Sequence, residues 1–495
     1  MKLKWPSVMS VMNANKLPLN RTKIVATIGT ASRTPEVLRK LIEAGVNVFR
    51  LNFSHGTHRE HSATLADIRA LSREVGHHVA VLQDLCGPKI RLGPIAGDVM
   101  ECPLGEEFSL VSASSSRNSR ELTCSYRELP NDLEPGETIL FADGTVAMTV
   151  TDTEPGRARL KVTLPGRLRS HQGVNLPGSE LAVQSLTDKD LHDLDWTARH
   201  AGDVEFVGLS FVRSAEDIAR LRRELQARKC PAWVVVKIEK PQAVRHLEEI
   251  VASTDCVMVA RGDLGVEMDV QCVPAIQKRI IELCNRAARP VITATQMLNS
   301  MEHSSRPTRA EASDVFNAVL DGTDAVMLSG ESAVGEYPLE AVTTMSEICA
   351  EAEGYLEARG LSPLGESVSL AELIEPITEA AVDAAYLMTE RLNAPLIVVA
   401  TDSGRTALAL SNRRPTATIL ALTRTERVAR ALALCWGVTP LLLPESSSSA
   451  EGELAFGIEW AKSHALVRPG QHVVLLRGQV AGQPKSRAVL TGEVS

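Results

Sequence analysis

The strongest constraint on the fold is a repeated alternation of short apolar runs with longer amphipathic stretches. Eight runs rich in Val, Ile and Leu lie at Thr22–Gly29, Asn47–Ser54, His78–Leu85, Phe206–Phe211, Trp233–Glu239, Cys256–Gly262, Pro290–Thr295 and Ala325–Gly330. Runs of this length and composition are typical of parallel strands that are covered on both faces. We therefore predict eight buried parallel strands.

Helical periodicity fills most of the gaps between these runs. Charged residues lie on one face and Leu, Ile or Ala on the other in seven stretches: Thr34–Ala44, His58–Glu74, Asp188–His200, Ser214–Arg228, Pro241–Val251, Val270–Ala288 and Arg306–Asp321. Eight alternating strand and helix units predict an α/β fold of the (β/α)8 TIM-barrel type, whose chemistry lies at the carboxyl ends of the strands. A doubly wound open sheet is the alternative, but it would gather its polar residues at one switch point.

Polar residues instead follow several different strands. They are Arg50, Asn52, Ser54, Asp84, Arg213, Lys237, Glu239, Asp263, Thr295, Ser329 and Glu331. Because residues two apart on a strand share a face, we expect Lys237 beside Glu239, and Arg261 beside Asp263 on the next strand. Isolated pairs of this kind are usually surface salt bridges, but the apolar run before each pair indicates burial. Two carboxylates and a lysine suit Mg²⁺ and a phosphoryl group.

The barrel is predicted over residues 21–86 and 187–355, after an N-terminal arm at 1–20. Between its two parts, residues 87–186 are rich in Pro and Gly and contain β-like stretches at Thr138–Phe141, Thr145–Thr151 and Ala158–Thr163. We predict a small inserted β-barrel domain in the loop between a strand and a helix. Its place above the active-site face predicts a lid that excludes water.

Residues 360–495 are predicted to form a separate α/β domain. Expected strands lie at Ala394–Thr401, Thr418–Thr423, Leu441–Leu443 and Gln471–Arg477, and expected helices lie near Leu370–Arg391, from Gly404, at Glu426–Trp436 and near Ala455–Ala465. One turn places hydroxyls, backbone N–H groups and an arginine at a helix N-terminus, which suits an anion: Thr401, Asp402, Ser403, Gly404, Arg405 and Thr406. The carboxylate of Asp402 would repel phosphate, so an ordinary capped helix is the alternative.

Composition narrows the function classes. The 495 residues carry a net charge of −8, which offers no general attraction to nucleic acid or to anionic membranes. Nine cysteines occur without a Cys-x-x-Cys pair, as expected of reduced packing residues in a cytoplasmic enzyme. We expect no secretory leader, no membrane span and no nucleic-acid partner.

Several segments, in order along the chain, resemble the pyruvate kinase family. They are Asn52–Gly56, Gly87–Arg91, Gly173–Gly178, Ser210–Arg213, Met258–Gly265, Ala294–Met297, Arg306–Glu311 and Met327–Glu331. The resemblance implies transfer of the phosphoryl group of phosphoenolpyruvate to ADP, which gives ATP and an enol that is protonated to pyruvate. It also suggests a homotetramer and a regulatory role for the C-terminal domain.

The resemblance also implies roles for individual residues. Glu239 and Asp263 would hold Mg²⁺, for which Mn²⁺ can substitute, while Lys237 and Arg50 neutralise the phosphoryl group. The remaining roles are binding of the substrate carboxylate at Gly262, Asp263 and Thr295, binding of the nucleotide by Arg91, Asn52 and His55, and enol protonation through Thr295, Ser329 and Glu331.

Two departures from the family pattern carry expectations of their own. Many members have Thr and Glu where this chain has Leu85 and Lys89, and they bind K⁺ beside the substrate. The ammonium of Lys89 can replace that ion, so we expect activity without K⁺; the residues of this region are Asn52, Ser54, Asp84, Leu85 and Lys89. Gln172 stands where the family usually has Lys, which removes a charge that can reach nucleotide phosphates.

The effector and the activity class have alternatives. Two features favour a sugar monophosphate or AMP over fructose 1,6-bisphosphate as the effector. One is the carboxylate of Asp402, and the other is that the Gly478–Gly492 tail lacks a pair of an arginine and a tryptophan that could bind phosphate together. Two further hypotheses are a Mg²⁺-dependent barrel lyase acting on phosphoenolpyruvate or pyruvate, and a regulatory homologue without turnover.

Overall fold

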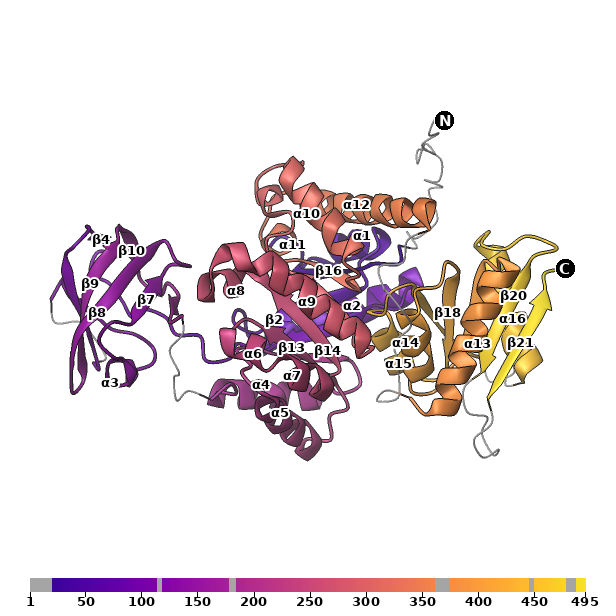
Figure 1. Cartoon of the computed structure of the whole chain (residues 1–495), viewed down its shortest axis with the longest axis horizontal. Helices are drawn as coiled ribbons and strands as arrows, with labels where there is room; N and C mark the ends of the chain where they lie inside the picture. Colours follow the sequence, from indigo (N-terminus) through magenta and orange to yellow (C-terminus); the bar gives the residue numbers. More distant parts are fainter. Residues whose placement is uncertain (1–19, 114–117, 178–183, 361–373, 445–448, 478–486) are drawn as a thin grey trace.

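A computed structural model describes residues 20–113, 118–177, 184–360, 374–444, 449–477 and 487–495. Figure 1 shows three bodies in a row, with the inserted β unit at one end, a barrel in the centre and an α/β unit at the other end. Apart from residue 20, the expected N-terminal arm lies outside the described residues, as does Gly178 of the Gly173–Gly178 segment. No helix in the described part of the chain is long and apolar enough to cross a membrane.

The central body is a closed barrel of eight parallel strands. They are β1 (Lys23–Ile28), β2 (Val48–Asn52), β3 (Ala80–Asp84), β12 (Phe206–Leu209), β13 (Trp233–Ile238), β14 (Cys256–Ala260), β15 (Val291–Ala294) and β16 (Ala325–Leu328). The order around the barrel is β1-β16-β15-β14-β13-β12-β3-β2, and every pairing is parallel. The predicted barrel is confirmed, and the open sheet is not formed.

Helices cover the outside of the barrel. They are α1 (Pro35–Glu43), α2 (His58–Val75), α4 (Asp188–Arg199), α5 (Ala215–Ala227), α6 (Pro241–Arg245), α7 (Leu247–Ser253), α8 (Arg261–Glu267), α9 (Val273–Arg286), α10 (Arg309–Leu320), α11 (Gly330–Ala333) and α12 (Pro338–Arg359). Four of them begin with a capping box, in which a Ser or Thr and the acidic residue three positions later satisfy each other's backbone N–H groups: α2, α4, α5 and α10.

Local details differ from the sequence prediction. Strand β14 ends at Ala260, so Arg261 and Asp263 lie in the first turn of α8 and do not share a strand face as expected. The helix predicted over residues 241–251 is split at His246 into α6 and α7, and the first three residues of the helix predicted over 270–288 form a 3-10 turn. Helices α11 and α12 were not predicted from the sequence, and α11, with four residues, is too short to show a helical period.

The inserted unit lies between β3 and α4. Its strands are β4 (Val99–Cys102), β5 (Glu107–Val111), β6 (Glu121–Leu122), β7 (Thr138–Phe141), β8 (Val146–Glu154), β9 (Arg157–Leu164), β10 (Gly166–Arg169) and β11 (Val174–Asn175), with one short helix, α3 (Leu129–Asp132). They form a six-stranded sheet, β11-β7-β8-β9-β5-β6, and a two-stranded sheet, β10-β4. One hydrophobic cluster fills this unit, so it has a core of its own.

The C-terminal unit is a five-stranded sheet with helices on its faces. Its elements are α13 (Pro376–Leu392), β17 (Leu396–Ala400), α14 (Arg405–Asn412), β18 (Thr418–Thr423), α15 (Glu426–Leu432), β19 (Val438–Leu442), α16 (Ala450–Ser463), β20 (His472–Arg477) and β21 (Ala488–Glu493). The strand order is β19-β18-β17-β20-β21, and only β21 is antiparallel. Strand β21 was not predicted from the sequence.

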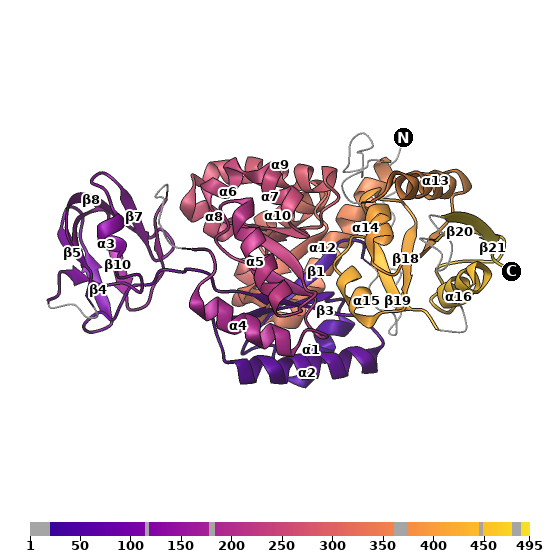
Figure 2. The same cartoon turned by 90° about the horizontal axis from the view of Figure 1, so that it is seen from below.

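Buried ion pairs join the barrel to the C-terminal unit. Helices α14 and α15 of that unit lie next to the barrel in Figure 2. Arg430 of α15 contacts Glu205, just before β12, at 2.7 Å, and Arg414 contacts Asp324, just before β16, at 3.0 Å. Both carboxylates therefore lie at the amino ends of barrel strands. The C-terminal unit covers the end of the barrel opposite to the polar residues described next.

Candidate active site at the carboxyl ends of the strands

Lys237 is the centre of the polar site. It lies near the end of β13, where its ammonium is 2.7 Å from Oε1 of Glu239 and 3.5 Å from Oδ2 of Asp84. The expected pairing of Lys237 with Glu239 on one strand face is confirmed. Burial alone would lower the pKa of Lys237, but the carboxylates of Asp84 and Glu239 outweigh burial and raise it, so the lysine is protonated.

Asp84 and Arg50 come from the two neighbouring strands β3 and β2. Arg50 donates from Nε to Oδ2 of Asp84 at 2.7 Å and from NH1 to the hydroxyl of Thr27 at 3.1 Å. Burial would raise the pKa of Asp84, which is 1% exposed, but the charges of Lys237 and Arg50 hold it below its usual value. The other oxygen of Asp84 is buried, and none of the described residues donates a hydrogen bond to it.

The turn after β12 supports this site, although the sequence alone assigned it no role. The ammonium of Lys237 donates to the hydroxyl of Ser210 at 3.0 Å, and the backbone N–H of Phe211 donates to Oε2 of Glu239 at 2.8 Å. Phe211 has a positive φ of 56°, which is costly for a residue with a side chain and points its N–H at the carboxylate. The available signal was a serine placed directly after a buried strand.

Glu239 and Asp263 are the expected metal ligands, and the structure places their charges near each other. Burial raises the pKa of the Glu239 carboxyl, Lys237 opposes the rise, and the charge of Asp263 adds to it. No side chain in the described part of the chain donates a hydrogen bond to Asp263. Among the described residues no group of three or more His, Cys, Asp or Glu could hold a metal, so substrate oxygens and water would have to complete a Mg²⁺ shell, as Mg²⁺ commonly allows.

Thr295 and Gly262 meet across the gap between β15 and α8. Thr295 has a positive φ of 65°, and its hydroxyl accepts the backbone N–H of Gly262 at 2.7 Å. Arg261, which was expected to face the metal site, points the other way and donates to the carbonyl of Thr295 at 2.8 Å and to Asp314. Arg261 therefore holds the strained turn that positions Thr295.

Ser329 and Glu331 follow β16. Oε2 of Glu331 accepts the backbone N–H of Ser329 at 2.8 Å, and Oε1 accepts that of Leu298 at 3.0 Å. Burial raises the pKa of Glu331, while these backbone hydrogen bonds oppose the rise. The hydroxyl of Ser329 is buried and has no partner among the described residues. Glu331 thus holds the backbone at Ser329 and Leu298, and the hydroxyl of Ser329 has no hydrogen-bond partner among the described residues.

The residues expected on the nucleotide side lie at the junction with the inserted unit. Burial lowers the pKa of His55, and the charges of Arg91, Lys89 and Arg50 lower it further, so three cations lie near this ring. Arg91 donates from NH1 to the carbonyl of His171 at 3.1 Å, inside the inserted unit. Asn52 lies opposite Asp84 in the strand register, and its side-chain oxygen accepts the N–H of Ser54 at 3.1 Å.

A cleft lies between the barrel and the inserted unit. Its walls include residues of both: Pro88, Lys89, Ile90, Val174, Asn175, Leu176, Phe211, Arg213, Lys240 and Gln242. The amide of Asn175 donates to Glu267 at 3.1 Å, and Lys240 contacts the same oxygen at 2.6 Å. These contacts bring the inserted unit directly against the barrel.

Leu85 and Gln172, which depart from the usual family pattern, are both held in place by their surroundings. Leu85 is 1% exposed and packs in a hydrophobic cluster, so its side chain offers no oxygen ligand. The side-chain oxygen of Gln172 accepts the N–H of Arg169 at 2.7 Å, which ties it into a local turn of the inserted unit.

The predicted anion turn lies far from this site, in the C-terminal unit. Gly404 caps α14 with φ of 83°, and its N–H donates to the hydroxyl of Thr401 at 3.0 Å. Asp402, Ser403 and Arg405 are exposed, whereas Thr401 and Thr406 are buried. Burial raises the pKa of nearby Glu453, and the charge of Asp402 adds to the rise.

The fold and this site together define a (β/α)8-barrel enzyme with an inserted β unit and a C-terminal α/β domain. Family models for "Pyruvate kinase, barrel domain" and "Pyruvate kinase, alpha/beta domain" match residues 19–342 and 379–490. The chain belongs to the pyruvate kinase family and is a phosphotransferase.

Individual relatives agree with this placement. The pyruvate kinase of Methylorubrum extorquens is 40% identical over 94% of this chain and 95% of its own length. That of Thermococcus litoralis is 37% identical over 94% and 97%. The crystal structure of a pyruvate kinase from Cryptosporidium parvum superposes with a TM-score of 0.89 at 34% identity and covers 100% of both chains.

Proposed function

We propose that this chain transfers the phosphoryl group of phosphoenolpyruvate to ADP and releases ATP and pyruvate. The observation that carries the proposal is the meeting of Lys237, Arg50, Asp84 and Glu239, from the carboxyl ends of three strands, at one end of a barrel of this family. A coupled assay of ADP-dependent pyruvate formation tests it. A lyase would act on phosphoenolpyruvate or pyruvate without ADP, and a homologue without turnover would do neither.

Lys237 and Arg50 are proposed to neutralise the phosphoryl group during transfer. Phosphoryl transfer depends mainly on positioning and on stabilising charge that spreads over the equatorial oxygens. Both cations already contact Asp84, which keeps them charged and in place. Replacing either cation leaves Asp84 buried with a weaker counter-charge, so loss of activity is expected to accompany some loss of stability.

Mg²⁺, or Mn²⁺ in its place, is proposed to bind Glu239 and Asp263. The residues fit such an ion, because two carboxylates lie close enough to interact and that of Asp263 accepts no hydrogen bond from the described residues. When bound, the ion would neutralise substrate oxygens and orient them.

The substrate carboxylate is proposed to bind near Gly262, Asp263 and Thr295. The N–H of Gly262 is aimed at the hydroxyl of Thr295 in the structure, so a carboxylate oxygen would replace that acceptor. On the opposite side, Arg91, Asn52 and His55 are proposed to bind ADP, with the inserted unit closing over it as a lid.

Protonation of the enol is proposed to involve Thr295 and Ser329. The hydroxyl of Ser329 lacks a partner among the described residues, while Glu331 holds the backbone that presents it. Ser329→Ala is expected to leave phosphoryl transfer measurable and to slow exchange of solvent protons into pyruvate. An equal loss of both activities would contradict this division of roles.

We further propose that turnover needs no K⁺, because the ammonium of Lys89 supplies the charge. Its nearness to His55 and the lack of an oxygen on Leu85 support the idea. Titration with KCl, NaCl and a bulky organic cation at constant ionic strength tests it. An activation of many-fold that is specific to K⁺ would refute it.

We also propose that a sugar monophosphate or AMP binds at the turn Thr401–Thr406 and regulates the enzyme. The enzyme is proposed to be a homotetramer in the cytoplasm. The exposed Ser403 and Arg405 support it, whereas Asp402 opposes a strongly anionic ligand. A thermal-shift screen of phosphometabolites, with Asp402→Lys as the comparison, tests the site. No response to any anion would favour a simple helix cap, and sedimentation would report the subunit number.

A further inference from the structure

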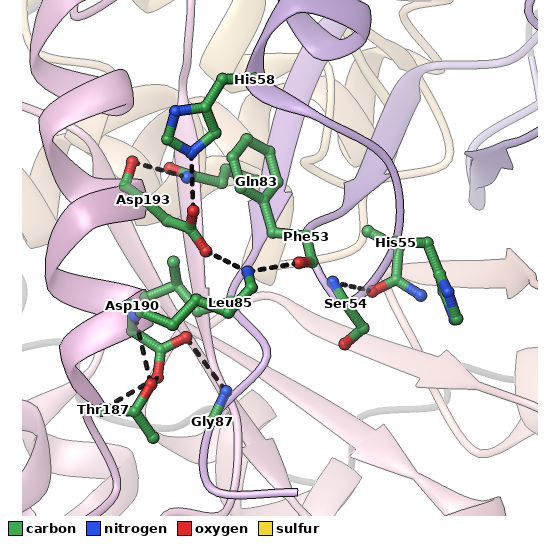
Figure 3. A network of polar contacts seen from close by, with 12 residues as sticks. Phe53, Ser54, His55, His58, Gln83, Leu85, Gly87, Thr187, Asp190 and Asp193 are labelled. Atoms are coloured by element: carbon green, nitrogen blue, oxygen red, sulfur yellow. Dashed lines mark hydrogen bonds and ion pairs between the residues drawn. The ribbon is translucent and has the colours of Figure 1, made fainter. Parts of the chain in front are cut away.

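The two segments that join the inserted unit to the barrel are held by one buried carboxylate. The chain leaves the barrel after β3 through Gly87 and returns through Thr187, directly before α4. Oδ1 of Asp190 accepts the backbone N–H of Gly87 at 3.2 Å, and Oδ2 accepts the N–H and the hydroxyl of Thr187 at 2.9 and 2.6 Å, as Figure 3 shows. Asp190 is 0% exposed, so water does not compete for these bonds.

A second carboxylate repeats this arrangement one helix later. Oδ2 of Asp217, in the first turn of α5, accepts the N–H groups of Arg213 and Ser214, and its Oδ1 accepts the hydroxyl of Ser185 at 2.7 Å. In a capping box, one oxygen of the acidic side chain is enough to accept the backbone N–H of the N-cap residue. In both helices the second oxygen holds a segment that leads into or out of the inserted unit.

The residue that Asp190 holds packs directly against the candidate active site. Gly87 has a positive φ of 65°, and a Cβ there would lie 2.8 Å from the ring of Phe211 and 3.1 Å from Cβ of Ser210. Phe211 donates its N–H to Glu239, and Ser210 accepts from Lys237. A displacement of Gly87 therefore pushes on the two residues that orient the lysine and the proposed metal ligand.

We propose that Asp190 is a positioning residue that fixes the point about which the inserted unit turns over the barrel. Asp217, through Ser185, anchors the returning segment a second time. Hydrogen bonds to a carboxylate are stronger than those to a neutral acceptor. An asparagine at position 190 has only one acceptor oxygen, and its NH₂ group would face an N–H donor. Either Gly87 or Thr187 would then lose its acceptor. Only the kinetic consequence below rests on the proposed function.

Amide hydrogen exchange of the full-length protein without ligands tests the anchor. Asp190→Asn is expected to speed exchange about tenfold or more at Gly87 or Thr187, because local opening there becomes easier. Glu311→Gln is the matched control, since Glu311 caps α10 at Thr308 and holds a second segment through Ser300, and both partners lie in the barrel and not in the inserted unit. It is expected to affect exchange only near Ser300 and Thr308. Unchanged exchange at both Gly87 and Thr187 in Asp190→Asn, or equal acceleration there in the control, would overturn the proposal.

A gentler variant covers the case in which Asp190→Asn does not fold. Ser185→Ala removes only the hydroxyl that bonds Asp217 and leaves both capping boxes intact. It is expected to speed exchange of residues 184–187 and to leave Gly87 unchanged; no change in this segment would count against the second anchor.

Kinetics add a readout that a purely structural role would not move. Asp190→Asn is expected to raise KM for ADP more than KM for phosphoenolpyruvate, because the proposed ADP site lies between the barrel and the inserted unit. A fall in kcat with both KM values unchanged would refute the positioning role. Hydrogen exchange needs no turnover, so it still tests the anchor if the proposed reaction fails.

Discussion

Arg430 offers the sharpest test of how the C-terminal unit is held to the barrel. The same guanidinium contacts two carboxylates in different surroundings: Nε lies 2.7 Å from Glu205, whose side chain is 0% exposed, and NH1 lies 3.0 Å from Glu426, whose side chain is 57% exposed. Glu205 is also bound by Arg69 at 2.7 Å and by the N–H of Val81 at 2.8 Å. The perturbation is Arg430→Met, which keeps an unbranched apolar stem and removes the charged guanidinium.

The expected cost follows from which carboxylate is left without its partner. Removing one member of a buried pair typically costs about 3–5 kcal/mol, because the other charge stays buried. Since Arg69 and Val81 continue to bind Oε2 of Glu205, we expect the lower end, about 3 kcal/mol. That corresponds to a roughly 150-fold change in the folding equilibrium. Glu426→Gln breaks the exposed pair to the same arginine and is expected to cost about 0.5 kcal/mol or less.

Scanning calorimetry is the suitable assay, because a chain with several domains need not unfold in one step. Arg430→Met is expected to lower the transition of the C-terminal unit clearly more than Glu426→Gln does. If Arg430→Met is no more destabilising than Glu426→Gln, burial does not determine the strength of this contact and the reasoning is wrong.

Three further predictions concern the site and the pH dependence. Asp263→Asn is expected to weaken Mn²⁺ binding about tenfold or more, as measured by titration calorimetry, because it removes a proposed charged ligand. Lys237→Met is expected to lower kcat about 100- to 1,000-fold through lost charge stabilisation, as measured by the coupled assay. Burial, with help from Lys23, lowers the pKa of His77 to about 4. The unfolded chain therefore binds a proton first as the pH falls from 6.5, and stability decreases by up to about 1.4 kcal/mol per pH unit down to the folded pKa. His77→Gln is expected to flatten this part of a plot of urea midpoint against pH, and an unchanged slope would exclude His77 as its cause.

The neighbourhood of Lys237 shows how far sequence patterns reach into the site. Its pairing with Glu239 follows from strand alternation alone, because the two residues are two positions apart. The expectation for Arg261 and Asp263 used the same rule and was wrong, because β14 ends at Ala260 and the following helix turns Arg261 toward Thr295 and Asp314. No local period marks the last residue of a strand.

Contacts between distant residues were beyond any local pattern. Ser210 and Phe211 reach Lys237 and Glu239 only because β12 and β13 are neighbours in the closed barrel. Likewise, Asp190 is an ordinary capping residue in the sequence, and its bond to Gly87 spans 103 positions.

The sequence by itself determined the barrel, the inserted unit and the family, since apolar periodicity and short ordered segments depend on residues close together in the chain. Only the tertiary structure decided which oxygens bind Lys237, which carboxylate holds both ends of the inserted unit, and which ion pairs join the C-terminal unit to the barrel. The physical reason is that a hydrogen bond or a buried ion pair depends on distances of about 3 Å, and such distances between remote residues exist only after the strands have closed into a barrel.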